Sequence, residues 1–172
     1  MSTSFYDLTV GSYLQIIEAA GDVLKRAAEH FATEGINLEE VVETRLIADM
    51  ANFHFQVTSF NHHSLGAVHA FKTGEFRPPN YPACGYSELQ AMTQNSIDEL
   101  KSQSREEVDR WVSGTVTFKL GGNEIPFTAQ NFALSFSLPN FYFHTATAYD
   151  ILRMKGAPIG KRDFLGAMKA GL

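Results

Sequence analysis

The residues best suited to chemistry lie close together in the segment 139–166. Asn140 and His144 are four residues apart, and on a helix this spacing places two side chains on one face, one turn apart. That is the geometry of a metal-binding HxxxH pair in which asparagine stands at the first histidine position. Asparagine is a weaker ligand than imidazole for zinc or nickel. Tyr142 and Tyr149 follow a neighbouring stripe of the same helix. The segment is therefore the first candidate for a functional surface.

The residues around His144 leave three roles open for it. Its imidazole could donate a hydrogen bond within the core, line a pocket, or ligate a metal ion. Because the helix supplies no second imidazole or thiolate within reach, we interpret His144 first as a core or hydrogen-bonding residue. A histidine that lines a pocket could also act as a general base.

A second polar set lies earlier in the chain, where the apolar spacing predicts one long helix from Asn37 to about Gly74. Two polar stripes follow from that helix. One carries Arg45, Asp49, Asn52, Gln56 and His63, and the other carries His54, His62 and His69. We interpret the histidines first as a solvated or partly buried polar face, and Asp49 could pair with Arg45 one turn back. No HxxxH or HxxH pair occurs here, so this helix alone cannot chelate a metal well.

The loop after the last helix, residues 156–166, contains the charged run Lys161, Arg162 and Asp163. These side chains could bind an anion, dock a second subunit or clamp the C-terminal tail onto the helices, and we take the clamp as the first interpretation. The loop lacks the GxxxxGK[ST] spacing of a phosphate-binding loop. Cys84 has no neighbouring base in the sequence, so we do not expect a nucleophilic cysteine there.

The elements that must position these residues are mostly helices. The spacing predicts a first helix from Ser4 or Tyr6 to about residue 32, a third helix over 87–102, and a last helix over about 140–155. Gly35 and Gly156 are the expected stops of the first and last helices. A proline-rich connection over 74–85 separates the second helix from the third.

A change of pattern after Trp111 predicts a small β element before the last helix. Apolar residues alternate over 116–120 and 125–127 on either side of two glycines, which is typical of a hairpin. An isolated hairpin is marginal, so it should pack on the helices. Thr128 is a plausible cap for a short helical segment, and we expect Pro139 to interrupt or kink the chain before the last helix.

The composition indicates one globular domain over residues 1–172. Hydrophobic residues make up 44% of the 172 residues and charged residues 19%, which is ordinary for a folded protein. The net charge of −5 argues against a nucleic-acid partner, which needs clustered Lys and Arg. A single cysteine excludes an intrachain disulfide and suits a reducing compartment, so we expect a cytoplasmic protein. Neither a signal peptide nor a membrane span is expected.

Three stretches of the sequence carry a resemblance: SFYDLTVGSYL, RLIADMANFHFQV and LPNFYFHTATAYDILRMKGAPIGKRDFLG. In order and spacing the chain resembles the domain of unknown function 1993 family over nearly its whole length. That family is similar in fold to the DinB/YfiT-like superfamily of proposed metal-dependent enzymes. The resemblance implies an all-α, DinB-like four-helix bundle with a long crossover, often dimeric, in which the hairpin is an insertion before the last helix.

The resemblance also implies where a metal would bind. The superfamily site uses one histidine of the second helix and an HxxxH pair of the last. His144 matches the second position of that pair, whereas Asn140 occupies the first, so one imidazole is missing. A zinc or nickel ion would then need His144 together with His54 or Asp49.

These observations favour a small-molecule-binding bundle with a polar and aromatic pocket between the second and last helices, in which acid–base catalysis is open. The candidate catalytic residues are His144 and Asp49, and the candidate binding residues are Asn52, Gln56, Asn140, Tyr142 and Tyr149. The runner-up is a non-catalytic homodimer that buries the aromatic ending at an interface. A third hypothesis is a variant zinc or nickel protein. The sequence names neither a substrate nor a reaction.

Overall fold

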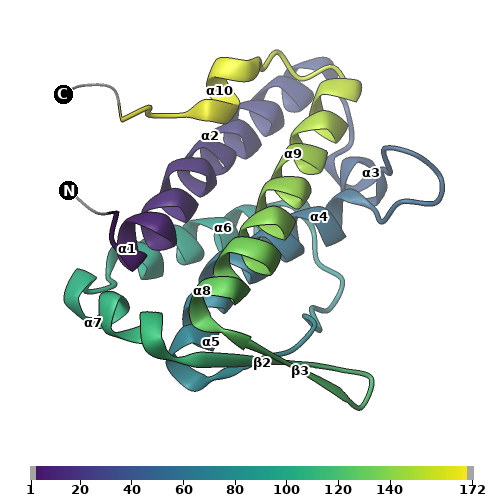
Figure 1. Ribbon diagram of the computed structural model, residues 1–172. Coiled ribbons are helices and arrows are strands. Elements are labelled where there is room, and N and C mark those ends of the chain that lie inside the picture. Colours follow the sequence, from purple (N-terminus) through teal and green to yellow (C-terminus); the bar gives the residue numbers. More distant parts are fainter. Residues whose placement is uncertain (1–2, 170–172) are drawn as a thin grey trace.

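The computed structural model describes residues 3–169 and is mainly helical. Its longest elements are α2 (Val10–Glu34), α6 (Tyr86–Lys101), α9 (Leu138–Met154) and the run formed by α4 (Phe53–Asn61), the π-helical segment η1 (His62–Gly66) and α5 (Ala67–Thr73). These elements pack side by side, with a small sheet at one end (Figure 1). None of the described helices is long and apolar enough to cross a membrane.

The core lies among α2, α4, α6 and α9 and is rich in aromatic rings. Its largest fully buried side chains include Tyr13, Phe31, Phe53, Phe60, Tyr86, Phe132 and Phe141. Tyr13 meets Phe141 edge-to-face at a centroid distance of 5.2 Å, an arrangement that adds to the stabilisation from burial alone. The buried phenol of Tyr86 donates to the carbonyl of Leu24 at 2.9 Å, so this polar group is satisfied.

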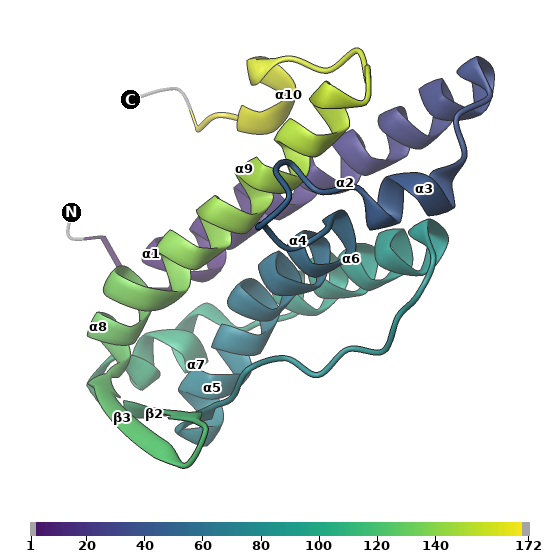
Figure 2. The same ribbon diagram turned by 90° about the vertical axis from the view of Figure 1, so that its right-hand side faces the viewer.

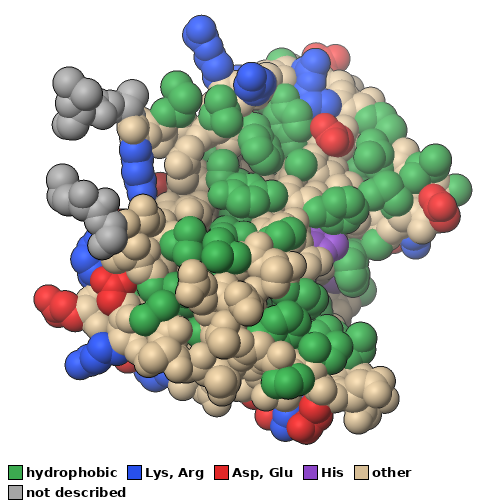
Figure 3. All heavy atoms as spheres, viewed as in Figure 1, with side chains coloured by type: hydrophobic (Ala, Val, Ile, Leu, Met, Phe, Trp, Pro, Cys, Tyr) green, Lys and Arg blue, Asp and Glu red, His purple; other side chains and the backbone are tan. Residues whose placement is uncertain are grey.

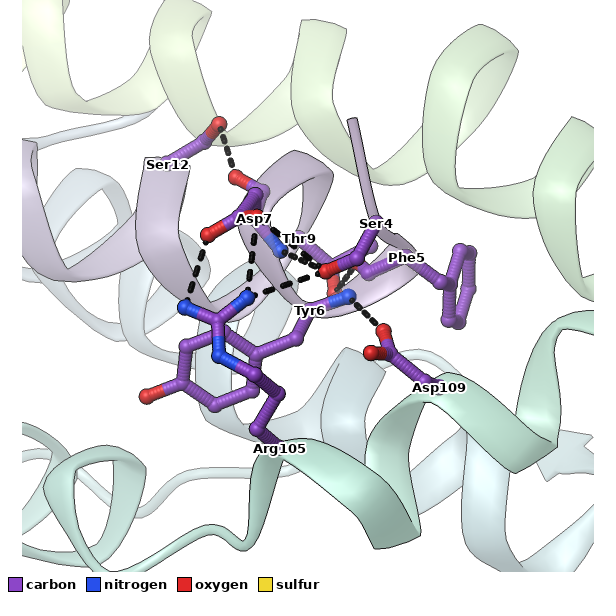
Figure 4. Close-up of polar contacts among 8 residues, drawn as sticks. All are labelled: Ser4, Phe5, Tyr6, Asp7, Thr9, Ser12, Arg105 and Asp109. Carbon is purple, nitrogen blue, oxygen red and sulfur yellow. Dashed lines mark hydrogen bonds and ion pairs between the residues drawn. The ribbon is translucent and has the colours of Figure 1, made fainter. Parts of the chain in front are cut away.

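The first predicted helix is divided in the structure into α1 (Phe5–Leu8) and α2, with the break at Thr9. Gly35 ends α2 as predicted, in the left-handed conformation with φ 69°. At the other end, Figure 4 shows how α1 is held by α7 (Arg105–Arg110). The Arg105 guanidinium pairs with the Asp7 carboxylate at 2.9 Å and lies over the Tyr6 ring at 4.4 Å, while Asp109 accepts from the Tyr6 amide at 2.7 Å.

The prediction of one long helix from Asn37 to Gly74 is wrong. The structure has a short helix α3 (Leu38–Glu43), irregular chain over 44–52, and then a new helix at Phe53. Asn52 starts that helix because its side-chain oxygen accepts from the Phe55 amide at 3.1 Å, and its amide group donates to Glu43 at 2.9 Å. Local bonds of this kind compete with a continuous helix.

The predicted hairpin is present, as part of a three-stranded sheet. β2 (Thr115–Leu120) and β3 (Asn123–Thr128) are antiparallel, and the two glycines between them have φ 56° and 85°. β1 (Glu75–Phe76), which the sequence did not indicate, pairs in parallel with β2. Phe118 of β2 packs on Phe136 at a centroid distance of 4.8 Å, so the sheet rests on the helices as expected.

The chain enters the last helix without the interruption expected at Pro139. Thr128 caps α8 (Ala129–Phe132) as predicted, and α8 continues through a π-helical segment, η3 (Ala133–Ser137), into α9. Proline removes one helical hydrogen bond and crowds the preceding turn, and here the preceding turn is the wider π type. The widened turn therefore admits Pro139 near the start of α9.

The loop after α9 forms the clamp that the sequence suggested. Gly156 follows the helix with φ 98°, and α10 (Lys161–Leu165) packs on α2. Asp163 pairs with Arg26 of α2, and Gln15 of α2 donates to the Leu165 carbonyl at 3.1 Å. A structural role therefore accounts for Asp163 of the charged run.

Candidate functional site

The histidine stripe predicted from the spacing of His54, His62 and His69 lies on one side of α4, η1 and α5. The His54 ring donates from Nε2 to the Pro82 carbonyl at 3.1 Å, and the His62 ring donates from Nε2 to the Arg77 carbonyl at 2.6 Å. Both acceptors belong to the proline-rich connection 74–85. Carbonyl oxygens only accept, so each histidine carries its proton on Nε2. Histidine side chains therefore fasten the connection to the helices.

Proline gives a reason for this arrangement. Pro78, Pro79 and Pro82 have no backbone N–H, so this stretch cannot form a regular ladder of hydrogen bonds. Figure 2 shows the connection as an irregular segment that runs alongside α5 and α6. The His62 ring also packs on Phe76 at a centroid distance of 4.4 Å. The connection is consequently joined to the helices by side chains of α4 and η1.

A cavity of about 790 Å³ lies beneath the connection. Its walls come from η1, α5, α6 and residues 75–81, and the polar or aromatic lining includes Asn61, His62, His69, Glu75, Phe76, Arg77, Asn80, Tyr81, Asn95 and Ser96. The volume falls within the range of small-molecule sites. Asn61 is buried, and its side-chain oxygen has no hydrogen-bond partner among the described residues. That oxygen has almost no accessible surface, so a ligand in the cavity would not contact it without a movement of the neighbouring side chains.

His62 stands where the cavity meets a second cluster formed by His63 and His144. The rings of His62 and His63 are 5.8 Å apart at their centroids, and those of His63 and His144 are 5.9 Å apart and nearly parallel. Burial lowers the pKa of His144 to about 4, and burial together with the neighbouring imidazoles lowers the pKa of His63 to about 3. Both rings are therefore neutral at pH 7 and are weak bases.

Gln56 fixes which nitrogen of His144 carries the proton. The Gln56 amide donates from Nε2 to the Ala51 carbonyl at 3.0 Å, which turns its Oε1 toward His144. His144 Nδ1 lies 2.8 Å from that oxygen and must donate to it. The remaining nitrogen, Nε2, is then an acceptor, and the rings of Phe55 and Phe143 flank the imidazole at 5.7 and 5.2 Å.

A buried hydrogen-bond chain, which we call the serine clasp (Tyr13, Ser137 and the His63 carbonyl), holds the two histidine-bearing elements together. Ser137 Oγ donates to the carbonyl of His63 at 2.5 Å, and the Tyr13 hydroxyl donates to Ser137 Oγ at 2.7 Å. Ser137 and His63 both belong to π-helical segments, η3 and η1. Such segments are often found at functional sites. The clasp thus ties α2, η1 and the start of α9 at one point.

The structure brings together only part of the predicted site. Gln56 and His144 meet as expected, but Asn140 turns its amide back to the Phe136 carbonyl at 2.7 Å. Tyr149 packs on Phe164 of the C-terminal clamp at 5.7 Å, and Tyr142 lies at the surface, 40% exposed. Of these residues, none lines the cavity beneath the connection.

The polar stripe predicted to run from Arg45 to His63 does not form as one face, because residues 44–52 are not helical. Asp49 is exposed in that irregular segment. The expected pair with Arg45 is wrong, since the Arg45 guanidinium donates to the carbonyl of Met50 instead. Asn52 serves as the cap of α4.

The ligand set that the family resemblance implied does not fit a metal ion in this chain. His54 directs Nε2 to the Pro82 carbonyl, Asp49 lies in the exposed segment, and Asn140 is bonded to the backbone. Among residues 3–169, no three His, Cys, Asp or Glu side chains gather as a metal site would require. His144 and His54 each keep one ring nitrogen without a hydrogen bond among the described residues, Nε2 and Nδ1 respectively, but no third ligand accompanies them.

Sequence reasoning missed the cavity and the residues that line it. The spacing predicts His62 only as part of a polar face, and no sequence pattern marks Tyr81 or Asn95, which line the cavity. The sequence signal for the cavity is a histidine stripe followed by a proline-rich connection. Such a connection lacks backbone N–H groups, so it relies on side-chain hydrogen bonds to hold it to the helices. What the sequence could not supply was the path of the connection.

Exposed aromatic rings surround His144. Phe55 and Phe143, which flank the imidazole, are 43% and 55% exposed. Figure 3 shows hydrophobic side chains gathered over α9 and over the segments beside it, with a histidine side chain reaching the surface among them. Exposed aromatic clusters of this kind are typical of interfaces.

Comparison with known proteins gives a family and a fold. The family model described as "Domain of unknown function (DUF1993)" matches residues 5–165. The crystal structure of a DinB family member protein from Shewanella denitrificans is similar over 97% of this chain and 94% of that chain, with a TM-score of 0.79 and 24% sequence identity. At that identity the likeness shows the fold alone. No curated protein matches the chain.

Proposed function

Because this chain belongs to the domain of unknown function 1993 family, whose description states no activity, we propose its function from the cavity: it binds a small molecule beneath the proline-rich connection. The carrying observation is the cavity of about 790 Å³, whose lining combines the aromatic rings of His62, Phe76 and Tyr81 with the side-chain amides of Asn80 and Asn95. The proposal includes the DinB-like four-helix arrangement, which the packing of α2, α4, α6 and α9 supports.

The histidines in and near the cavity are better suited to binding a ligand than to general base catalysis. His144, the expected general base, has a pKa of about 4 and does not line the cavity. The pKa of His62, which does line it, is lowered by burial, and its Nε2 is committed to the Arg77 carbonyl. An efficient general base has a pKa near the working pH, so neither imidazole is tuned for that role.

A tryptophan placed in the cavity tests the proposal. Asn95→Trp introduces an indole at a lining position of α6, and Gln94→Trp introduces the same ring at the preceding residue, which is equally exposed but does not line the cavity. Ligand-observed NMR of an aromatic fragment library should find ligands for the wild type and for Gln94→Trp that Asn95→Trp no longer binds. Circular dichroism checks that both variants fold. A library without binders, or binders that Asn95→Trp retains at full strength, would refute the proposal.

A second candidate function is self-association through the apolar face around His144. The observation that favours it is the exposure of Phe55 and Phe143 on either side of a half-buried imidazole. We propose a homodimer in which these rings are buried against their copies. Light scattering at micromolar concentration should give twice the chain mass, and Phe143→Ser should give the monomer. Leu120→Ser, at the exposed hairpin tip, is the matched control. A monomeric wild type contradicts this candidate and leaves the cavity proposal untouched.

A further inference from the structure

The chain between Phe76 and Tyr86 is fixed at its two ends and loosely held between them. Phe76 and Tyr86 are 3% and 1% exposed, and Tyr86 donates to the Leu24 carbonyl within the core. The residues from Arg77 to Cys84, which we call the strap, are all exposed or half-buried. Moving the strap would uncover little of the apolar core, and segments with this property open locally at a low cost in free energy.

The backbone of the strap is held to the helices by histidine side chains. The His62 ring donates to the Arg77 carbonyl at 2.6 Å, and the His54 ring donates to the Pro82 carbonyl at 3.1 Å. No backbone group of the strap forms a hydrogen bond with another backbone group among residues 3–169. The position of the strap consequently depends on two imidazoles, one toward each of its ends.

The imidazole of His62 is itself held in place by its neighbours. Its ring packs on Phe76, and Gly66 leaves room for it, since a methyl group there would lie 2.9 Å from His62 Nδ1. A donor that is already fixed in this way loses little further side-chain entropy when it binds the strap. His62 can therefore release and rebind the Arg77 carbonyl without a rearrangement of the helices.

We propose that the strap is a movable cover of the cavity, which opens as one unit when His54 and His62 release the two carbonyls. The strap forms one wall of the cavity, whereas η1, α5 and α6 form the wall opposite. A small molecule that contacts both walls binds the closed state more tightly than the open state and so holds the strap shut. This inference rests on the proposed function and adds how access to its site is controlled.

Cys84, the single cysteine of the chain, reports on this motion from the last position of the strap. Its side chain is half-buried against the core, and burial together with the charges of Glu88 and Glu39 raises the pKa of its thiol. Labelling by N-ethylmaleimide should therefore be faster when the strap is open. His62→Ala should accelerate the labelling about three- to tenfold, because the loss of one hydrogen bond shifts the opening equilibrium by about that factor. His54→Ala should do the same, and the double variant should show the product of the two factors.

His62 is the decisive position, because it binds the strap at the end remote from Cys84. His69→Ala is the matched control, since His69 belongs to the same histidine stripe and lines the cavity but bonds to Glu99 instead of the strap. Its labelling rate should stay within about twofold of the wild-type rate. His62→Gln, which keeps a side-chain N–H donor, should label more slowly than His62→Ala. Circular dichroism checks that every variant folds.

The outcomes separate this inference from the function on which it rests. If His62→Ala labels like the wild type, or His69→Ala accelerates as much as His62→Ala, the strap does not open as one unit and the inference is wrong, while binding in the cavity stands. An aromatic fragment that Asn95→Trp no longer binds should slow the labelling of the wild type at saturation, and an unchanged rate would refute the cover. If the library yields no such fragment, the proposed function falls, and the labelling rates of the variants alone decide whether the strap opens as one unit.

Discussion

Among single-atom deletions in the serine clasp, Ser137→Ala should lower the free energy of unfolding the most. The side chain of Tyr13 is fully buried, and its hydroxyl has Ser137 Oγ as its partner. Ser137→Ala leaves that hydroxyl unpaired, which costs about 1–3 kcal/mol, and removes the bond to the His63 carbonyl, worth about 0.5–1.5 kcal/mol more. The free energy of unfolding should therefore fall by roughly 2–4 kcal/mol.

Tyr13→Phe supplies the contrast, because it removes the same phenol bond without leaving a buried group unpaired at that side chain. Its cost should be only about 0.5–1.5 kcal/mol. The double variant should be no less stable than Ser137→Ala alone, since the phenylalanine removes the stranded hydroxyl. Urea unfolding followed by circular dichroism measures all three. A Ser137→Ala cost below that of Tyr13→Phe, or strictly additive costs, would refute the reasoning.

Three further predictions concern the histidines. The pKa of His63 is about 3 in the fold and 6.5 unperturbed, so the unfolded chain binds this proton first as the pH falls. The free energy of unfolding should therefore be highest above pH 6.5 and decline by up to about 1.4 kcal/mol per pH unit toward pH 3. Urea titrations at several pH values should find a weaker dependence of that free energy on pH for His63→Gln. In Gly66→Ala the new methyl would lie 2.9 Å from His62 Nδ1, so the imidazole ring must move. Hydrogen exchange over residues 75–84 should then accelerate, even though alanine favours the helix by about 1 kcal/mol. Unchanged exchange would contradict the anchoring role of His62. Zinc in tenfold excess should leave the melting temperature within about 1 °C of its metal-free value, and a saturable rise that His144→Ala abolishes would show that a metal site forms after all.

Local signals predicted much of the fold. Gly35 and Gly156 end their helices as expected, Thr128 caps α8, and the paired glycines close the hairpin. Each of these signals acts within a few residues, so it can be read from the sequence. The break at 44–52 escaped prediction because the apolar spacing continues through it, and only the bonds of Asn52 to Phe55 and Glu43 decide the outcome.

The site was less predictable because its contacts are distant in sequence. Gln56 and His144 are 88 positions apart, and their meeting was anticipated only as two polar residues near one pocket. The histidine stripe was visible as a spacing, whereas its acceptors, the carbonyls of Arg77 and Pro82, depend on where the connection runs. β1 is two residues long and pairs with a strand some 40 positions later, so no local pattern marks it.

The two π-helical segments make chain length at these turns as important as residue type. A π turn holds one residue more than an α turn, and deleting a residue from it would rotate the helix beyond by roughly 100°. In η1 such a deletion would swing His69 and the rest of α5 away from the cavity, and in η3 it would turn His144 away from Gln56. Among homologous chains, insertions or deletions within 62–66 and 133–137 should therefore mark the members that have lost this site, even where every named side chain is retained.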